Sequence, residues 1–559
     1  MASAATVSVA LEGVDDETRQ NVLTYLEINR LADREDLSEL VIRLQHRKAS
    51  GNIQSALRPL GYYAASVETS LEQDGERWLA TYKVTLGERV RFRNVTIGLE
   101  GPASEDPEFA ALVAALAPAS GDALRHDRYE AIKNSLLTRA LDRGYFEAQF
   151  LRRRLDIFPE SLAADIELVF ASGPRYRVGN ITVEQDALHD WIVRRYLTFS
   201  SGDYFDAAKL LDLQYALYDS DYFSFVEVSN GEPDKASSEV TVRVVASAAN
   251  RQRYRLALGY GTDTEGRVGV GWENRRINRR GHKLRFDSRL SAIKQEVTGR
   301  YVWPLSAPTR ERIVLNLSTL QEDLADTRSR RVELGVTQST ARRVWERDFY
   351  VRLLREATRE SGVTSTETLL LPGVLWIRSK TDDLVYPRRG SKLSAEVKGS
   401  HSALGSDVDF VQLKLQGKLI FPAGKRARLL SRAEIGATSV GKNSSLPASL
   451  RFFAGGDQSV RGFGLNTLGP VDENGDVVGG RFLLSGSIEY EKLITERWGM
   501  AAFVDAGNAL NELDESLEIS AGLGLRWLSP IGMVRLDVAR PLNASGESPR
   551  LHLTVGAEL

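Results

Sequence analysis

The side chains that most often carry catalysis or bind metals are few and scattered in this 559-residue sequence. Cysteine is absent, which excludes disulfides, thiolate metal sites and cysteine nucleophiles. The six histidines show neither an HExxH motif nor a paired spacing, and they are His46, His126, His189, His282, His401 and His552. A P-loop, a GxSxG motif and a dinucleotide-binding fingerprint after a strand are missing too. We therefore expect neither an enzyme nor a bound metal or cofactor.

One cation stands out because it lies in the glycine-rich stretch Arg451–Pro470. Glycines let such a segment fold tightly on itself. Its tip carries the residues Val460, Arg461, Gly462 and Phe463. A guanidinium can hold carboxylates through several hydrogen bonds at once, so Arg461 is a candidate for an ion pair with acids elsewhere in the chain. A glycine-rich loop tipped by one charge is also typical of an ordinary surface loop.

A two-residue alternation dominates from about residue 251 onward. In segments such as 254–260, 482–490 and 517–527, one face carries leucine, isoleucine, tyrosine or tryptophan and the other carries glycine, serine or charge. A soluble sandwich gives the same alternation. A sheet this long would expose its edges unless it closed, and in a bilayer closure is obligatory. At about 19 residues per strand and loop, the pattern predicts an all-β transmembrane barrel of about 16 antiparallel strands over residues 249–559.

The same alternation directs two acids to the inner face of this barrel. Glu489 lies on the polar face of segment 482–490, and Asp505 alternates with Val504. Acids in a partly dehydrated lumen are candidates for ion pairs with an arginine, because such a pair is stronger there than at the surface. The alternative is that both acids are ordinary solvated residues of the lumen.

Residues 6–247 alternate short strands with helical stretches, and one pattern recurs among them. An aromatic pair follows a helix-like run at Gly61-Tyr62-Tyr63, at Gly144-Tyr145-Phe146 and at Asp221-Tyr222-Phe223. The spacings are 144 − 61 = 83 and 221 − 144 = 77 residues. Such repetition predicts three α+β modules of the order β-α-α-β-β, over residues 1–88, 89–174 and 175–248. Three unrelated small α+β domains are the alternative.

The glycine that ends the helix in the first two copies fits the left-handed position after a helix. Asp221 replaces this glycine in the third copy, so we expect a different helix end there.

Charge and hydropathy exclude other classes. A net charge of −2 with 26% charged residues shows no excess of basic residues, which argues against a nucleic-acid-binding protein. The sequence has no run of about 18 apolar residues that would form a transmembrane helix. Residues Met1–Ala5 lack the basic and apolar regions of a signal peptide. A membrane barrel therefore requires that a signal peptide has been removed from this sequence, and a cytosolic protein is the alternative.

The motif Val460-Arg461-Gly462-Phe463 resembles the VRGF/Y signature of the outer-membrane protein insertase superfamily. The longer run FFAGGDQSVRGFG is most similar to the branch of the translocation and assembly module subunit TamA, which also has three N-terminal modules. The resemblance implies that the modules are polypeptide-transport-associated (POTRA)-like domains in the periplasm. It further implies a barrel in the bacterial outer membrane, with residues 452–480 folded inward as a lid loop.

The resemblance also assigns roles to single residues. Arg461 would pair with Glu489 and Asp505 and lock the lid loop inside the barrel. The first strand, over about residues 252–262, would meet the last, over about residues 550–557, at a weak seam that opens laterally. The residues that we expect at this seam are Tyr254, Leu256, Gly259, Gly261, Leu551, Leu553, Val555 and Gly556. Glycine weakens strand pairing, although relief of crowding in a curved sheet explains the same glycines.

The implied function is that of an assembly or translocation factor, which helps to insert or secrete client proteins such as autotransporters. The implied partners are unfolded outer-membrane clients, the lipid bilayer, and an inner-membrane-anchored, periplasm-spanning (TamB-like) protein that docks on the POTRA-like modules. A two-partner-secretion-type transporter that passes clients through the lumen, a plain porin or receptor, and a soluble binding protein remain as alternatives.

Overall fold

The computed structural model describes residues 5–556 except 33, 35, 36, 262–264, 325, 361, 384, 385, 442–444, 530, 531 and 544–547. The chain separates into two compact units. The first comprises Met1–Thr182, Thr198–Asp212 and Val228–Val244, and the second comprises Val183–Leu197, Leu213–Glu227 and Val245–Leu559. The second unit therefore contains the whole barrel together with two segments of the third module.

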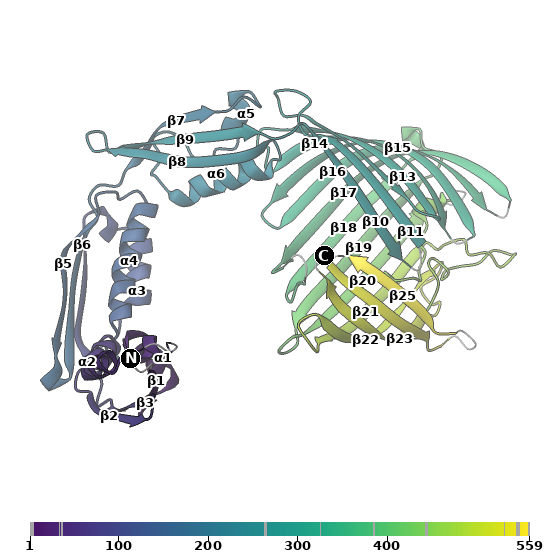
Figure 1. Ribbon diagram of the computed structural model, residues 1–559. Coiled ribbons are helices and arrows are strands. Elements are labelled where there is room, and N and C mark those ends of the chain that lie inside the picture. Colours follow the sequence, from purple (N-terminus) through teal and green to yellow (C-terminus); the bar gives the residue numbers. More distant parts are fainter. Residues whose placement is uncertain are drawn as a thin grey trace. The chain divides into compact units, whose positions relative to one another are not determined.

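Three small α+β modules occupy the N-terminal half, each with two helices packed on a three-stranded sheet (Figure 1). The first contains β1 (Thr6–Glu12), α1 (Asp16–Tyr25), α2 (Glu39–Leu57), β2 (Ser66–Asp74) and β3 (Arg77–Thr85). The second contains β4 (Arg91–Glu100), α3 (Pro107–Leu116), α4 (His126–Asp142), β5 (Gln149–Phe158) and β6 (Ala163–Ala171). The third contains β7 (Arg177–Glu184), α5 (Asp190–Arg194), α6 (Ala207–Asp219), β8 (Phe223–Asp234) and β9 (Glu239–Ala248).

The last strand of each module lies in the middle of its sheet, in the orders β1-β3-β2, β4-β6-β5 and β7-β9-β8. Alternate side chains of this central strand are buried under the helices, as Trp78 and Tyr82 are on β3. The predicted order β-α-α-β-β is thus confirmed in all three modules. Short 3₁₀ helices are η1 (Asn29–Leu31), η2 (Arg58–Leu60), η3 (Pro102–Ser104), η4 (Pro159–Ser161), η5 (Ser402–Leu404) and η6 (Ala448–Leu450).

The helix ends of the three modules share one backbone conformation. Gly61 and Gly144 have φ values of 92° and 83°, and Asp221 has a φ of 64°. The expectation of a different helix end at Asp221 is therefore wrong for the backbone, because aspartate tolerates the left-handed region better than most residues. What differs is the side chain, since the Asp221 carboxylate accepts a hydrogen bond from Arg253 at 2.9 Å.

Sixteen antiparallel strands follow in sequence order and form one sheet, β10 to β25, as predicted (Figure 1). The first eight are β10 (Gln252–Gly261), β11 (Glu265–Asn274), β12 (Lys283–Leu290), β13 (Lys294–Pro304), β14 (Glu311–Leu324), β15 (Thr327–Arg342), β16 (Trp345–Glu360) and β17 (Val363–Thr381). The others are β18 (Gly390–Ser400), β19 (Phe410–Pro422), β20 (Ala427–Val440), β21 (Phe482–Leu493), β22 (Trp498–Leu510), β23 (Glu518–Ser529), β24 (Gly532–Pro541) and β25 (Arg550–Gly556).

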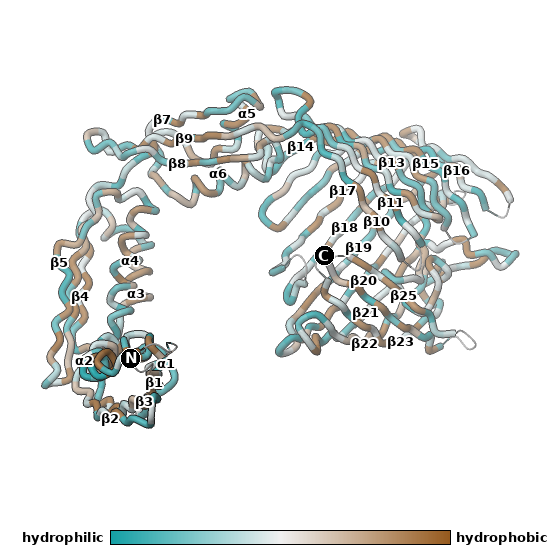
Figure 2. The backbone as a smooth tube through the Cα atoms, in the orientation of Figure 1, coloured by the Kyte–Doolittle hydropathy of each residue, from teal (hydrophilic) through white to brown (hydrophobic). Residues whose placement is uncertain are grey.

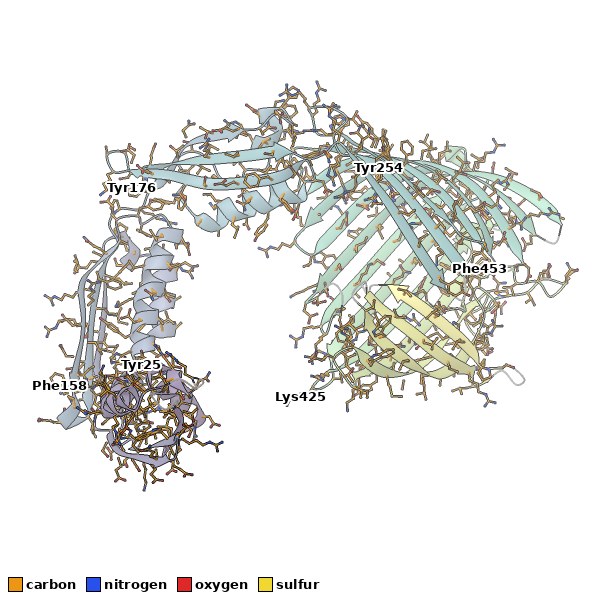
Figure 3. The ribbon with its side chains drawn as sticks, viewed as in Figure 1. Tyr25, Phe158, Tyr176, Tyr254, Lys425 and Phe453 are labelled. Atoms are coloured by element: carbon orange, nitrogen blue, oxygen red, sulfur yellow. The ribbon has the colours of Figure 1, made fainter. Side chains whose placement is uncertain are left out.

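The outer face of this barrel is apolar. Hydrophobic and hydrophilic residues alternate along the barrel strands (Figure 2), and side chains project from both faces (Figure 3). On β10, Tyr254, Leu256 and Leu258 are 72%, 73% and 77% exposed. Large apolar side chains with this exposure on every second residue are typical of strands that face lipid.

Exposed tryptophans mark one rim of the barrel. Four exposed tryptophans lie at or near strand ends on the same rim, beside the connections β13–β14, β15–β16, β21–β22 and β23–β24: Trp303, Trp345, Trp498 and Trp527. Aromatic residues collect at the membrane–water interface, so these side chains mark its level on this rim. Separately, none of the helices in the described part of the chain is long and apolar enough to span a bilayer.

Candidate functional site

The loop between β20 and β21 folds back on itself as a closed unit. We call residues 452–480 the lid loop. Phe452 and Gly480 exchange backbone hydrogen bonds of 2.9 and 2.8 Å, and Ala454 and Leu468 exchange two of 3.0 Å. Gly455 allows this close packing, because it has a φ of 99° and an added Cβ would lie 2.3 Å from the carbonyl oxygen of Gly464.

The tip of the lid loop is buried against the barrel wall. Val460 and Phe463 are 0% and 7% exposed and share an apolar cluster with Leu483 of β21 and Ala509 of β22. This packing removes apolar surface from water and holds the motif of residues 460–463 in the lumen. The loop is therefore not an ordinary surface loop.

Arg461 contacts both acids that the alternation pattern singled out. Its Nε and Nη2 atoms donate to the two carboxylate oxygens of Asp505 at 2.7 and 2.9 Å, and its Nη1 donates to Glu489 at 2.7 Å. Nη1 also donates to Asp537 at 3.1 Å, and Nη2 donates to the hydroxyl of Ser487 at 3.2 Å. The guanidinium, which is 4% exposed overall, thus uses its planar fork on one acid and its remaining donors on two others.

The positions of these acids follow from the strand register. Ser487 of β21 lies directly opposite Asp505 of β22, so both point to the lumen together. Asp537 of β24 lies opposite Gly524 of β23, where an added Cβ would be 1.9 Å from the Asp537 carboxylate. The absence of a side chain at residue 524 therefore leaves room for Asp537 to reach the lid loop.

A second arginine extends this network along the wall. Arg526 of β23 donates to Glu489 at 2.6 Å, to Glu491 at 2.6 Å and to Asp537 at 2.5 Å. Arg428 of β20 donates to Glu491 at 2.6 Å. Sequence reasoning missed this part of the site, although Arg526 lies on the polar face of segment 517–527 and Asp537 alternates with apolar neighbours in the same way.

Ion pairs connect acids and arginines in this region, which we call the lumen network. It contains four acids, Glu489, Glu491, Asp505 and Asp537, and four arginines, Arg428, Arg432, Arg461 and Arg526. Asp505 and Arg428 are 0% exposed and Arg526 is 1% exposed. Buried charges are tolerated only when they are paired, so removing Arg461 would leave one carboxylate uncompensated.

The two ends of the sheet form the seam. Fifteen ladders join the sixteen strands in sequence order, from β10–β11 to β24–β25. β10 and β25 come next to each other, but no ladder joins them within their described residues.

The predicted seam residues lie on these two strands. Tyr254 and Leu256 face outward on β10, and Leu551, Leu553 and Val555 share one face of β25. Gly259 and Gly261 pair with Arg267 and Glu265, so they do not interrupt the ladder to β11. Gly556 pairs with Met533 and is the last residue of β25, so it does not interrupt that strand either. Thr262 and Ala557, the outer limits expected for the two strands, lie outside the described residues.

The third module is joined to the barrel by side chains around Asp221. The Tyr222 hydroxyl donates to the carbonyl of Gly281, in the turn between β11 and β12. The Lys283 ammonium donates to the carbonyl of Ser220 at 2.5 Å. These contacts occur inside the second compact unit and fix the base of the module to the start of the barrel. Nowhere among the residues described is there a cluster of three or more histidines and acids placed to hold a metal ion.

Comparison with family models matches residues 250–558 to the Omp85 superfamily domain. Residues 8–86 match the POTRA domain described as TamA domain 1, and residues 176–247 match a POTRA model described as a surface antigen variable number repeat.

The chain is also similar to curated and solved proteins. It is 22% identical over 560 residues to the outer membrane protein assembly factor BamA of Neisseria meningitidis serogroup B. This match covers 87% of this chain and 69% of that protein. It is 24% identical over 428 residues to BamA of Nitratidesulfovibrio vulgaris, covering 72% and 53%, so it spans about half the length of that relative. The crystal structure of BamA from Haemophilus ducreyi lacking POTRA domains 1–3 superposes with a TM-score of 0.70 at 16% identity, covering 84% of this chain and 99% of that one. At this identity the superposition bears on the fold alone.

Proposed function

The chain belongs to the Omp85 superfamily, and from this premise we propose that it is an assembly factor that helps to insert or secrete client proteins through the seam between β10 and β25. The barrel lies in the bacterial outer membrane and the POTRA domains lie in the periplasm. The clients are unfolded outer-membrane proteins such as autotransporters.

The observation that carries this proposal is that the described residues of β10 and β25 lie next to each other but form no ladder. A strand edge with unpaired N–H and C=O groups accepts another strand by addition. In lipid such groups cannot be satisfied by water, so a client strand that pairs with the edge lowers the free energy of both partners. The energy for insertion then comes from client folding into the bilayer, and no nucleotide is needed.

The lumen network favours a lateral route over one through the lumen. Transport through the lumen requires the lid loop to leave, and this would separate Arg461 from the carboxylates of Asp505, Glu489 and Asp537. Separating one partner from a buried ion pair costs about 3–5 kcal/mol. Opening the seam breaks none of these contacts, because all four residues lie on the lid loop or on β21, β22 and β24.

The partner that we propose is an inner-membrane-anchored, periplasm-spanning (TamB-like) protein docked on the POTRA domains. Support comes from the match of residues 8–86 to a TamA-type POTRA domain. Deleting residues 5–86 should abolish co-purification of such a partner while the barrel stays folded. Retention of the partner by the deleted protein would move the docking site to another module.

The experiment that tests the function uses engineered disulfides, which the absence of native cysteine makes unambiguous. Leu256→Cys is combined in turn with Leu551→Cys, Leu553→Cys and Val555→Cys, because all four positions avoid the lumen face and leave the lid contacts intact. The control joins Leu256→Cys to Val270→Cys, which lie directly opposite each other in β10 and β11. Each variant is reconstituted in liposomes, and client folding is followed by protease protection with and without reductant.

We expect a crosslinked seam to stop client assembly, reductant to restore it, and the control disulfide to have no effect. If clients assemble with the seam fully crosslinked, the lateral route is wrong and transport through the lumen, as in a two-partner-secretion transporter, takes its place. If clients assemble in neither redox state, the protein is a plain porin or receptor.

A further inference from the structure

Within the described residues, the last strand forms a ladder on one edge. β25 pairs with β24 through seven opposed residue pairs, from Ala539–Arg550 to Met533–Gly556. Its other edge has no ladder to β10 within the residues described. A short strand that is paired in a ladder along one edge opens locally at lower cost than a strand paired along both, so contacts beyond the ladder help to keep its position defined.

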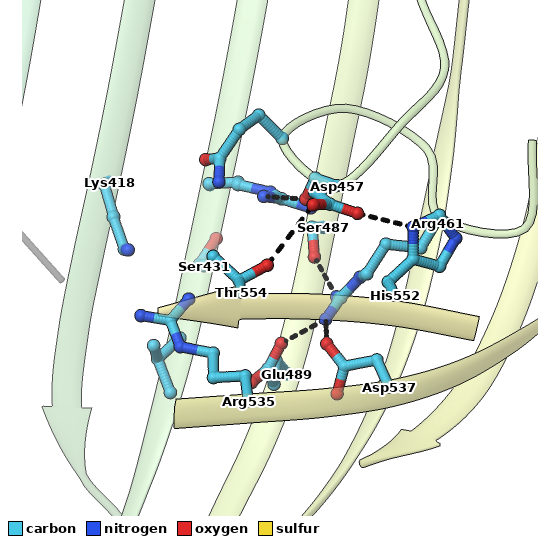
Figure 4. Close-up of a pocket in the computed structure, with 13 residues that line it drawn as sticks. Lys418, Ser431, Asp457, Arg461, Ser487, Glu489, Arg535, Asp537, His552 and Thr554 are labelled. Atoms are coloured by element: carbon cyan, nitrogen blue, oxygen red, sulfur yellow. Dashed lines mark hydrogen bonds and ion pairs between the residues drawn. The ribbon is translucent and has the colours of Figure 1, made fainter. Parts of the chain in front are cut away.

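The lid loop supplies a second set of contacts to β25 from the lumen side. Asp457 places one carboxylate oxygen 2.5 Å from Nδ1 of His552 and accepts a hydrogen bond from the Thr554 hydroxyl at 3.3 Å with the other (Figure 4). The backbone N–H of Gly462 donates to Nε2 of His552 at 3.1 Å. We call these contacts of Asp457 and Gly462 with His552 and Thr554 the clasp.

Donor and acceptor rules determine the state of the histidine in the clasp. A backbone N–H can only donate, so Nε2 of His552 must be the acceptor. The imidazole proton therefore sits on Nδ1 and is donated to Asp457, and the ring is neutral. His552 is 3% exposed and the Asp457 side chain is 13% exposed, so water competes little for these hydrogen bonds.

The clasp is separate from the lumen network although the two share one short stretch of chain. Arg461 holds the stretch to β21, β22 and β24. Arg432 holds it to β20 by donating to the carbonyls of Asp457 and Ser459 at 3.0 and 3.3 Å. Asp537 lies opposite His552 in the ladder, but it is bonded to Arg461 and Arg526. No side chain of the clasp is thus a member of the lumen network.

We infer that Asp457 and His552 are positioning residues that hold the terminal strand, so that the lid tip must release β25 before its edge is free to move. A template edge has to be held in register between clients and released during pairing. One carboxylate and one imidazole can do this reversibly, because only a few hydrogen bonds have to break. This inference rests on the proposed function for its biological meaning, whereas the mechanical coupling stands on the contacts alone.

Hydrogen exchange of the full-length protein in lipid nanodiscs tests the coupling. His552→Leu introduces an apolar side chain of similar bulk and removes both hydrogen bonds of the imidazole, whereas His552→Gln keeps one donor and one acceptor. Asp457→Ala removes the other half of the clasp, and Thr554→Val makes the mildest change. Asp514→Ala, which removes an exposed acid from the loop between β22 and β23, is the matched control.

We expect backbone amides of β25 to exchange at least tenfold faster in His552→Leu and in Asp457→Ala, which corresponds to about 1.4 kcal/mol of opening free energy. The two effects should add only in part in the double variant, because both single variants remove the contact between His552 and Asp457. His552→Gln should restore most of the protection, Thr554→Val should have a smaller effect, and Asp514→Ala should have none. Unchanged exchange in β25, or faster exchange in the lid loop alone, would overturn the inference.

The outcome is distinguishable from that of the proposed function. If β25 exchange does not change while crosslinking the seam still blocks client assembly, the clasp is wrong and the function stands. If β25 exchange rises as expected but clients assemble with the seam crosslinked, the coupling stands and the function is wrong.

Discussion

Replacing Arg461 by alanine tests whether buried charge holds the lid loop in place. The variant removes the ion pairs of Arg461 with Glu489, Asp505 and Asp537 in the lumen network. Glu489 and Asp537 keep Arg526 at 2.6 and 2.5 Å. Asp505, which is 0% exposed, keeps the more distant Arg432 at 3.8 Å and the backbone N–H of residue 461, which donates to it at 3.1 Å.

The magnitude follows from this uneven loss. Removing one partner of a buried ion pair costs about 3–5 kcal/mol. Because two of the three acids retain an arginine, we expect the lower end of the range, about 3 kcal/mol, which is about 150-fold in the opening equilibrium of the lid loop. Arg461→Lys keeps the charge but loses the planar fork, so its effect should be intermediate.

The assay is hydrogen exchange of the amides in residues 457–464, with the protein reconstituted in lipid. Asp505→Asn is added to Arg461→Ala to remove the stranded charge, and the double variant should recover a substantial part of the lost protection. An increase in exchange of less than about fivefold in Arg461→Ala, equivalent to about 1 kcal/mol, would refute the reasoning. The reasoning would also be refuted if the loss of opening free energy in the double variant equalled the sum of the losses in the two single variants.

Further predictions concern the POTRA domains and their junction with the barrel. Gly144→Ala should destabilise the second module by about 1–3 kcal/mol, because the φ of 83° is strained for alanine and its Cβ would lie 2.9 Å from that of Phe205. The midpoint of thermal unfolding should therefore fall, and an unchanged midpoint would contradict this. Burial by itself would raise the pKa of Asp106, but the hydrogen bond and charge of Arg143 outweigh it and lower that pKa. The carboxylate thus contributes stability that is fully present above about pH 4, the ordinary pKa of an unfolded aspartate, and is lost as the pH falls through the lower folded pKa. Thermal unfolding between pH 3 and 7 should accordingly show a weaker pH dependence in Asp106→Asn, and an identical profile would exclude this role. Tyr222→Phe should lower the stability of the junction by about 1 kcal/mol, because a buried hydrogen bond from the hydroxyl to a carbonyl is lost. Hydrogen exchange in the turn between β11 and β12 should rise, and equal exchange in both proteins would show that the bond contributes nothing.

Local patterns explain which parts of the fold could be predicted. Alternation along a strand depends only on the pleat of the backbone, so the lipid-facing Leu256 and the inward-facing Glu489 and Asp505 could be assigned from neighbouring residues. Helix ends were less certain, because Asp221 adopts the backbone conformation of the glycines that it replaces.

The rest of the candidate site depends on which strands meet around the barrel. Arg526 and Asp537 belong to the same two-residue pattern, but their contact with Glu489 and Arg461 requires the actual stagger of β21, β23 and β24. Gly524 looked like a neutral position on a polar face, yet its missing side chain makes space for Asp537. No spacing rule in the sequence contains this information, since register in a closed sheet is a property of the whole sheet.

Patterns within the sequence were enough to predict three repeated modules, a barrel of about sixteen strands, and a glycine-rich loop carrying Arg461. Each of these follows from short-range periodicity or from one compact motif. The contacts that the loop makes with β25 became known from the folded structure. Asp457 and His552 are 95 residues apart, and they meet because the lid loop folds into the lumen beside the last strand. A contact of this kind arises from barrel closure and loop packing together, and it leaves no periodic trace in the chain.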